Sequence, residues 1–266
     1  MTNTFLKMQT VCLKYRDKTV FKDVNLEFLQ PEIVSIIGPN GSGKSTILKA
    51  LSRILTPASG YVYLQNESLQ KIPTECVART ISILPQSANA PGDMTVRDLT
   101  ACGRIPYQNL WGSRTLNDDA AIDEALDITG LTKLQNRLLS TLSGGEKQRA
   151  WLSMALAQKP KILLLDEPTT YLDVKHQLEL MELIVKLHRE CDMTIIMVLH
   201  DLNHAARYST RLIAVKEGIV VADGNVKEVF TVGVLEELYD VQVVVTKIER
   251  DGCSYPICLP YTKENY

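Results

Sequence analysis

The sequence predicts an α/β fold built on a mostly parallel sheet. Short apolar runs recur along the chain; they are rich in leucine and β-branched residues and barely alternate with polar ones. Continuous apolar strands are typical of a sheet that is covered on both faces. Helical patterns lie between the runs, and this alternation favours parallel strands joined by crossover helices. The runs are IVSII (33–37), ISIL (81–84), KILLL (161–165), TIIMVL (194–199) and RLIAV (211–215).

The two ends of the chain predict antiparallel structure instead. The first thirty residues alternate between polar and apolar types, as in YRDKTVFKDVNLEF. Near the C-terminus, Asp251-Gly252 separates the strand-like runs VQVVVTKIER and CSYPICLP, which predicts a hairpin. We therefore expect an N-terminal antiparallel β subdomain and a C-terminal hairpin around the parallel core.

The middle of the chain predicts a helical subdomain inserted into this core. Thr95 to Asp98 fits a capping box, and residues 117–119 precede an apolar helical pattern that Gly130 closes. Pro160 stops the helix that begins after Ser143. The expected division is 1–87 for the antiparallel β region and the first part of the core, 88–159 for the helical subdomain, 160–230 for the second part of the core, and 231–266 for the C-terminal extension.

A further helix is predicted from Val174. The apolar residues Leu178, Met181 and Val185 follow it at spacings of one helical turn, so we expect these four side chains to lie on one face of the helix.

Composition excludes several classes of protein. The 266 residues are 45% hydrophobic, which is enough for a packed core, and the 29 basic residues nearly balance the 31 acidic ones. This balance gives no reason to expect a nucleic-acid partner. No apolar run approaches the roughly 20 residues that span a bilayer, and MTNTFLKMQT lacks the pattern of a signal peptide. The six cysteines form no CxxC pair, so we expect neither a disulfide scaffold nor a cysteine metal site.

A phosphate-binding loop follows the first apolar strand. Residues 38–46 read GPNGSGKST and lead into the helical stretch ILKALSRIL, which is the pattern GxxxxGK[ST] between a strand and a helix. The backbone N–H groups of such a loop point at phosphate oxygens, and the helix N-terminus adds partial positive charge. We expect Lys44 to reach the β- and γ-phosphates and Ser45 to bind Mg²⁺. The predicted nucleotide-binding residues are Gly38, Pro39, Asn40, Gly41, Ser42, Gly43, Lys44, Ser45 and Thr46.

Two carboxylates end a second apolar strand, in KILLLDEP. Asp166 is expected to hold Mg²⁺, directly or through water, because this hard cation prefers oxygen ligands. Glu167 lies one residue further, where it could accept a proton from an attacking water. The alternative is that Glu167 only caps the next element.

A second helix start carries two glycines, in TLSGGEKQRA. Ser143 and Glu146 have the spacing of a capping box, which offers a structural explanation. Capping does not require Gly144 and Gly145, however, and glycine in a helix interior costs about 1 kcal/mol relative to alanine. The missing Cβ atoms would let another group approach the backbone closely. We therefore expect a second anion site, which two chains facing each other head to tail would use twice.

Taken together, these stretches resemble the ATP-binding-cassette (ABC) ATPases. GPNGSGKST, PQ (85–86), LSGGE (142–146), LLLDEP (163–168), TTYLD (169–173) and LHD (199–201) occur in the order of that family, and the resemblance covers nearly the whole chain. It implies a P-loop NTPase core and a dimer of two chains that sandwiches two ATP molecules. In that dimer the phosphate loop of each chain faces the LSGGE signature of the other, so Ser143, Gly144, Gly145 and Glu146 would serve the partner's nucleotide.

The resemblance also assigns roles to single residues. Gln86 matches a glutamine that senses Mg²⁺ and the attacking water, and His200 matches the histidine that contacts the γ-phosphate. Asp173 matches the aspartate that communicates across the dimer, and Tyr15 matches an aromatic residue that stacks on adenine. Without the motifs around them, His200 would be interpreted as a core histidine and Tyr15 as a packing residue.

One departure from the family pattern lies in the signature. The glutamine that usually ends it is Glu146 here. The substitution keeps the capping geometry but brings a negative charge near a nucleotide, which puts a direct contact of this side chain in question.

The closer similarity is to the ATPases of bacterial importers for ferric siderophores, ferric citrate, haem and cobalamin. The matching stretches are MTVRDLTACGRIPY (94–107), DEPTTYLDVKHQLELM (166–181) and VLHDLNHAARYSTRLIAVKEG (198–218). The resemblance implies ATP hydrolysis with Mg²⁺ at the cytoplasmic side of the membrane, a polytopic permease as partner and, indirectly, a substrate-binding protein. Within that group we expect a ferric siderophore or ferric citrate as cargo. The alternatives are a haem or cobalamin importer and a soluble ABC ATPase outside transport.

The permease surface is expected after Gln86, in residues 87–112. Met94, Ile105, Tyr107, Leu110 and Trp111 lie in this loop-rich stretch. They either fill the core of the helical subdomain or line a groove for a short permease helix.

Overall fold

The computed structural model describes residues 5–15, 18–29, 31–86, 90–108, 115–250 and 252–261. The chain forms two compact units, one made of residues 1–71 and 194–266 and the other of residues 72–193. Each unit is described separately below. Among the residues described, none of the α-helices combines the length and the apolar character that spanning a bilayer requires.

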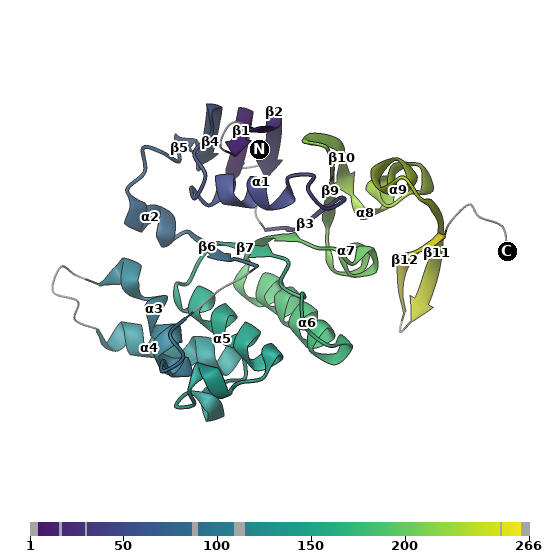
Figure 1. Cartoon of the computed structure of the whole chain (residues 1–266). Helices are drawn as coiled ribbons and strands as arrows, with labels where there is room; N and C mark the ends of the chain where they lie inside the picture. Colours follow the sequence, from purple (N-terminus) through teal and green to yellow (C-terminus); the bar gives the residue numbers. More distant parts are fainter. Residues whose placement is uncertain are drawn as a thin grey trace. The chain divides into compact units, whose positions relative to one another are not determined.

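The first unit holds the strands that carry the phosphate loop (Figure 1). Strand β3 pairs in parallel with β8 on one side and with β9 on the other, and β10 continues the sheet as an antiparallel neighbour of β9. All five residues of β3 and all five of β8 are buried, as expected for strands covered on both faces. The elements are β3 (Ile33–Ile37), α1 (Lys44–Leu51), β8 (Thr194–Val198), α7 (Leu202–Tyr208), β9 (Arg211–Lys216) and β10 (Ile219–Asn225).

The N-terminal part of this unit is antiparallel, which confirms the prediction from its alternating pattern. Strand β1 pairs with β2 and with β4, and both pairings are antiparallel. The burial of β1 alternates over its first residues, so one face packs on the core. The elements are β1 (Leu6–Tyr15), β2 (Lys18–Phe28), β4 (Ser59–Leu64) and β5 (Glu67–Ser68).

The C-terminal part of this unit ends in the predicted hairpin. Strands β11 (Gln242–Arg250) and β12 (Cys253–Tyr261) pair from Gln242↔Tyr261 to Arg250↔Cys253; Asp251 lies outside the described residues. The Cys258 N–H donates to Asn203 Oδ1 at 2.8 Å, which ties β12 to α7. Two short helices precede the hairpin, α8 (Val226–Val229) and α9 (Val232–Tyr239).

The second unit combines two parallel strands with most of the helices. Strands β6 and β7 pair in parallel from Ile81↔Ile162 to Leu84↔Leu165. Their bounds confirm the run predicted at 81–84 and move the run predicted at 161–165 by one residue. The elements are α2 (Thr74–Ala78), β6 (Ile81–Leu84), α3 (Val96–Cys102), α4 (Leu116–Ile128), α5 (Gly144–Ala157), β7 (Ile162–Asp166) and α6 (Val174–Cys191), with 3₁₀ turns at Ile105–Tyr107, Thr132–Leu134 and Leu139–Thr141.

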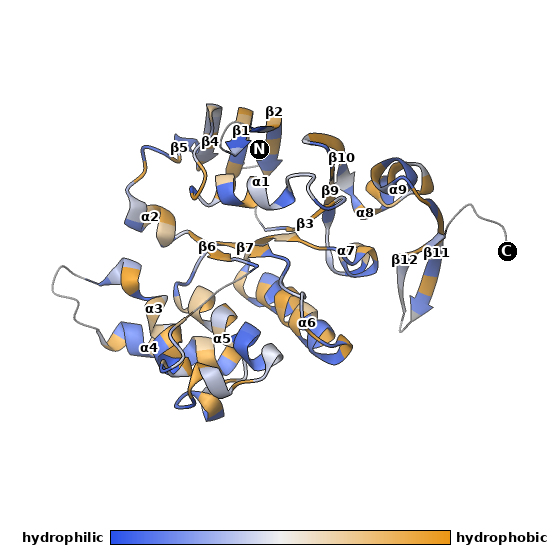
Figure 2. Ribbon diagram, in the orientation of Figure 1, coloured by the Kyte–Doolittle hydropathy of each residue, from blue (hydrophilic) through white to orange (hydrophobic). Residues whose placement is uncertain are grey.

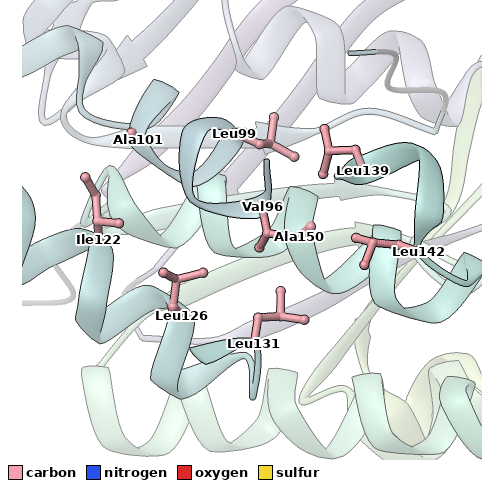
Figure 3. Close-up of a cluster of buried hydrophobic side chains, with 9 residues drawn as sticks. All are labelled: Val96, Leu99, Ala101, Ile122, Leu126, Leu131, Leu139, Leu142 and Ala150. Atoms are coloured by element: carbon pink, nitrogen blue, oxygen red, sulfur yellow. The ribbon is translucent and has the colours of Figure 1, made fainter. Parts of the chain in front are cut away.

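Helices α3, α4 and α5 share one apolar cluster (Figure 3). Figure 3 shows side chains from all three helices and from the turns between α4 and α5 pointing toward one another. The nine residues are at most 7% exposed, and this burial accounts for the helical subdomain having a core of its own. They are Val96, Leu99, Ala101, Ile122, Leu126, Leu131, Leu139, Leu142 and Ala150.

Two details of the helices differ from the sequence prediction. The cap of α4 is Thr115, whose hydroxyl accepts from the Asp118 N–H, so residues 117–119 lie inside the first turn rather than before it. The buried face of α6 is Leu180, Met181, Ile184 and Leu187, whereas Val174 is 72% exposed. The predicted face shares only Met181 with the observed one, because Val174 is exposed in the first turn of α6 and Leu178 and Val185 are only half-buried. Figure 2 shows the hydrophobic and hydrophilic residues that alternate along this helix.

A buried ion pair joins the first turn of α4 to the segment that follows α3. Arg104 Nε donates to Asp118 Oδ1 at 2.8 Å, and the two side chains are 7% and 2% exposed. The Thr115 N–H and hydroxyl donate to the other carboxylate oxygen at 2.9 and 2.8 Å. Burial alone would raise the pKa of Asp118, but the hydrogen bonds from Thr115 and Arg104 outweigh it and hold this pKa below its ordinary value of 3.8.

We expect Asp118→Asn to lower the free energy of unfolding by about 3–5 kcal/mol at pH 7, because it leaves the buried Arg104 charge without its partner. Since the folded-state pKa of Asp118 is depressed, the carboxylate stabilises the fold above its unfolded-state pKa and loses this effect as the pH falls. The difference between wild type and variant should therefore shrink below about pH 4. Urea unfolding at several pH values measures it. The control is Asp119→Asn, whose half-exposed ion pair with Arg97 should contribute less than about 1 kcal/mol; equal effects of the two variants would contradict the assignment.

Candidate nucleotide site

The phosphate loop connects β3 to α1 in the first unit. Gly43 caps α1 with φ of 104°, and a Cβ there would lie 2.3 Å from the Phe21 ring. Only glycine satisfies both constraints, because a side chain would be strained and would overlap the ring. Asn40 and Gly41 are exposed at the loop tip, and Ser45 and Thr46 are half-buried. The loop therefore presents backbone N–H groups at the start of a helix, which is the arrangement that binds phosphate.

Lys44 is the buried cation of this loop. Its side chain is the first of α1 and is 5% exposed. Nζ donates to the carbonyl oxygens of Gly38 and Pro39, both at 2.9 Å, so the ammonium is held over the concave side of the loop. Ser42 is also buried, and its hydroxyl has no hydrogen-bond partner among the described residues. A buried polar atom of this kind is expected where a ligand supplies the partner.

The two predicted carboxylates lie at the end of β7 in the second unit. Asp166 is 6% exposed and Glu167 is half-buried. Glu167 has φ of 52°, a left-handed conformation that is rare for this residue type. Such outliers cluster at functional sites, so the backbone supports a functional role over that of a simple cap. The oxygen donors of Asp166 and Ser45 are the type that Mg²⁺ prefers, and a magnesium ion bound with ATP takes few ligands from the protein itself.

Gln86 lies beside Glu167. Its Nε2 donates to Glu167 Oε2 at 2.5 Å, and the Thr170 hydroxyl donates to the same oxygen at 3.2 Å. Two neutral donors thus orient this carboxylate, which is the type of group that can accept a proton from water. The sequence did not identify Thr170; the three-residue spacing from Glu167 was the only available signal.

Two residues assigned by resemblance lie in the first unit. His200 follows β8 and is exposed, so it is not the core histidine of the alternative interpretation. Tyr15 ends β1 and is 57% exposed, so it does not pack in the core. An exposed ring can stack on a planar base, which is the role that the resemblance implies for Tyr15.

The LSGGE stretch begins α5 with the predicted capping box. The Ser143 N–H donates to Glu146 Oε2 at 2.8 Å, and the Glu146 N–H donates to Ser143 Oγ at 3.3 Å. Hydrogen bonds to its carboxylate from the backbone and the side chain of Ser143 hold the pKa of Glu146 below its usual range, so this side chain is a carboxylate at neutral pH. One carboxylate oxygen of Glu146 accepts the capping bond from the Ser143 N–H. The cap therefore keeps the negative charge of Glu146 close to the backbone of its own chain.

The TTYLD stretch leads from the carboxylates into α6. Asp173 caps that helix by accepting the His176 N–H at 2.9 Å, and this bond keeps the pKa of Asp173 below its ordinary value. Tyr171 and Val174 flank the cap and are 90% and 72% exposed. These two side chains offer exposed apolar surface beside the TTYLD stretch.

A family model described as "ABC transporter" matches residues 21–170. The chain belongs to the ABC transporter family. It is 44% identical over 255 residues to the ferric enterobactin transport ATP-binding protein FepC of Escherichia coli (strain K12), an alignment that covers 96% of this chain and 93% of that protein. It is 42% identical to the iron(3+)-hydroxamate import ATP-binding protein FhuC of Bacillus subtilis (strain 168), with 96% and 94% covered.

Solved structures of ABC proteins have the same fold. A dimeric post-hydrolysis state of the ATP-binding cassette MJ0796 bound to ADP and Pi superposes with a TM-score of 0.73 at 30% identity. The match covers 83% of this chain and 98% of that one. The α/β fold with a parallel-rich sheet and separate antiparallel sheets, predicted from the sequence, is thereby confirmed.

The stretch predicted to face a permease is partly packed in this ABC protein. Met94 packs against the cluster of α3, α4 and α5, and the Tyr107 hydroxyl donates to the Gln158 carbonyl at 2.9 Å. Ile105 is 62% exposed, whereas Leu110 and Trp111 lie outside the described residues. Met94 and Tyr107 therefore fit the core interpretation, and Ile105 is the side chain available to a partner.

Proposed function

We propose that this chain is the ATP-hydrolysing subunit of a bacterial importer that takes up a ferric chelate, either a siderophore or ferric citrate. The observation that carries the proposal is the similarity over nearly the full chain to ATPases named for ferric enterobactin and ferric hydroxamate transport. Both relatives are named for the transport of ferric chelates, and we therefore propose iron chelates in preference to haem or cobalamin.

In the proposed reaction, water attacks the γ-phosphate of ATP and ADP leaves. Lys44 neutralises phosphate charge, and the loop N–H groups bind the phosphate oxygens. Glu167 accepts the proton of the attacking water, and Gln86 and Thr170 orient its carboxylate. His200 donates to the γ-phosphate. Ser45, Gln86 and Asp166 are the residues that would hold Mg²⁺, and this ion would neutralise charge on the phosphates.

We further propose that two copies of the chain work as a nucleotide sandwich. In it, Ser143 and Gly144 of one chain face the ATP held by the phosphate loop of the other, and Tyr15 stacks on adenine. The exposed Tyr171 and Val174 beside Asp173 supply apolar surface for this interface. ATP closes the dimer and hydrolysis opens it, which drives a polytopic permease that receives cargo from a substrate-binding protein. The chain would then lie on the cytoplasmic face of the membrane as a peripheral subunit.

Uptake in a strain that lacks this gene tests the cargo. The strain is given labelled iron as a catecholate siderophore, a hydroxamate siderophore or ferric citrate, and in parallel labelled haem and cobalamin. The wild-type gene should restore uptake of a ferric chelate, and Glu167→Gln, as the matched control, should not. Restoration of haem or cobalamin uptake alone, or of none of these cargoes, would contradict the proposal.

A further inference from the structure

The first turns of α5 and α6 contact each other within the second unit. Arg149 of α5 and Glu179 of α6 form an ion pair at 3.2 Å. One helical turn closer to LSGGE in α5 and to TTYLD in α6, Gly145 lies against His176. A Cβ on Gly145 would be 2.8 Å from His176 Cδ2 and 2.9 Å from Cγ. A real Cβ does not fit at such distances, so the imidazole occupies the place of a side chain at position 145.

The other edge of the same imidazole is bound to Asp173. Its Nδ1 lies 2.7 Å from Asp173 Oδ1, the oxygen that also accepts the His176 backbone N–H. Because the carboxylate can only accept, Nδ1 carries the proton of this bond. The ring is therefore fixed at one edge by TTYLD and packed at the other against LSGGE.

The two glycines of LSGGE consequently differ. Gly145 is buried and its missing Cβ is explained within the chain by His176. Gly144 is exposed, and a Cβ there would meet only the Tyr171 carbonyl oxygen at 3.8 Å, an ordinary contact distance. Only Gly144 has an open face for a group that approaches from outside.

We propose that His176 is a positioning residue that joins Asp173 and the start of α5 into one rigid unit. The proposal rests on the sandwich dimer above, and it specifies how two motifs of one chain reach the partner's nucleotide together. Without the ring, Asp173 keeps its cap on α6 but no longer has a fixed distance to Ser143 and Gly144. Tight ATP trapping between two chains should then weaken, whereas ATP binding by the phosphate loop of a single chain should not change.

A double-mutant cycle tests this contact. Gly145→Ala, His176→Ala and the double variant are made in a Glu167→Gln chain, and the ATP concentration that gives half-maximal dimer is measured by gel filtration with Mg²⁺. We expect each single variant to need about tenfold more ATP, and the double variant to need less than Gly145→Ala alone, because the space for the new methyl group is then free. An equal effect of Gly145→Ala in both backgrounds would overturn the proposal, since it would mean that position 145 acts without His176.

Two further variants separate positioning from simple packing. His176→Asn keeps a donor near the position of Nδ1 but removes the edge that covers Gly145, so it should retain part of the dimerisation and tolerate Gly145→Ala. His188→Ala is the matched control, because this histidine of α6 hydrogen-bonds to the Met193 carbonyl at 2.9 Å and lies away from the motifs. It should leave the ATP concentration for half-maximal dimer unchanged, with Gly145 or with Gly145→Ala. If Gly145→Ala does not fold, recovery of soluble protein in the double variant supports the contact, and normal trapping by His176→Ala contradicts it.

The same experiment distinguishes this inference from the proposed function. A Glu167→Gln chain that binds ATP but forms no dimer would refute the sandwich itself. If the dimer forms normally with ATP and the effects of Gly145→Ala and His176→Ala simply add, only the role of His176 is refuted.

Discussion

Lys44→Ala should lower the affinity for ATP by about tenfold to a hundredfold and reduce ATPase activity in proportion. The buried ammonium is the cation that the phosphate loop itself provides, and hydrogen bonds to a charged group contribute about 1.5–3 kcal/mol each. In the structure Nζ is held by the Gly38 and Pro39 carbonyls, so the side chain is already placed on the concave side of the loop. Equilibrium binding of labelled ATP to the purified chain measures the affinity.

Lys49→Ala is the control for this prediction. Lys49 lies in the last turn of the same helix, α1, and is half-buried rather than buried. Its loss removes one positive charge from α1 without touching the loop, so ATP affinity should stay within about twofold of wild type. Wild-type ATPase activity in Lys44→Ala would exclude the loop as the nucleotide site.

Glu167→Gln should separate ATP binding from hydrolysis. Removing a general base typically lowers the rate by about 10²–10⁴, whereas the amide keeps the shape of the side chain and can still accept from Gln86 and Thr170 through its carbonyl oxygen. We expect ATP to bind normally and to accumulate in a stable dimer, because hydrolysis no longer dissolves it. Single-turnover hydrolysis and gel filtration with ATP and Mg²⁺ measure the two effects.

The comparison variant is Glu190→Gln, near the C-terminal end of α6, where the glutamate forms an exposed ion pair with Lys186. Its hydrolysis rate should match that of wild type. A Glu167→Gln chain that hydrolyses ATP at the wild-type rate would remove this residue from the proposed mechanism, and one that binds ATP but remains a monomer would refute the sandwich dimer.

The sequence predicted correctly those strands and helix caps that depend only on residues within a few positions of one another. The strands at 33–37 and 81–84 were predicted with their observed bounds, because a continuous apolar run between a turn and a loop defines both ends. The capping boxes at Thr95 and Ser143 were confirmed, since both partners of each bond lie within four residues. The α/β fold could also be predicted from local patterns, because apolar strands that alternate with helices are compatible with few other topologies.

The sequence prediction failed where the environment of a residue depends on residues that are distant in the sequence but close in the fold. The predicted face of α6 shared only Met181 with the buried one, because the apolar residue Val174 is exposed in the first turn of the helix. The two glycines of LSGGE look equivalent in the sequence, and only the position of His176, more than thirty residues further on, distinguishes Gly145 from Gly144. Gln86 and Glu167 are likewise far apart in the chain, and their hydrogen bond follows from the pairing of β6 with β7.

The central claim is that LSGGE serves the ATP of the opposite chain, and complementation within a mixed dimer tests it most directly. One chain carries Lys44→Ala and the other Ser143→Arg, both with Glu167→Gln to block hydrolysis and each with its own affinity tag. In a sandwich, one composite site collects both lesions, and the other joins the intact loop of the second chain to the intact signature of the first.

The quantity to measure is the ATP that stays bound per dimer after rapid removal of free nucleotide. Each homodimer has no undamaged site and should trap almost none. The mixed dimer should trap about one ATP, because a two-fold symmetric sandwich contains two composite sites and only one remains intact. If the mixed dimer traps no more than the two homodimers, each nucleotide is served within one chain and LSGGE is only a capped helix start.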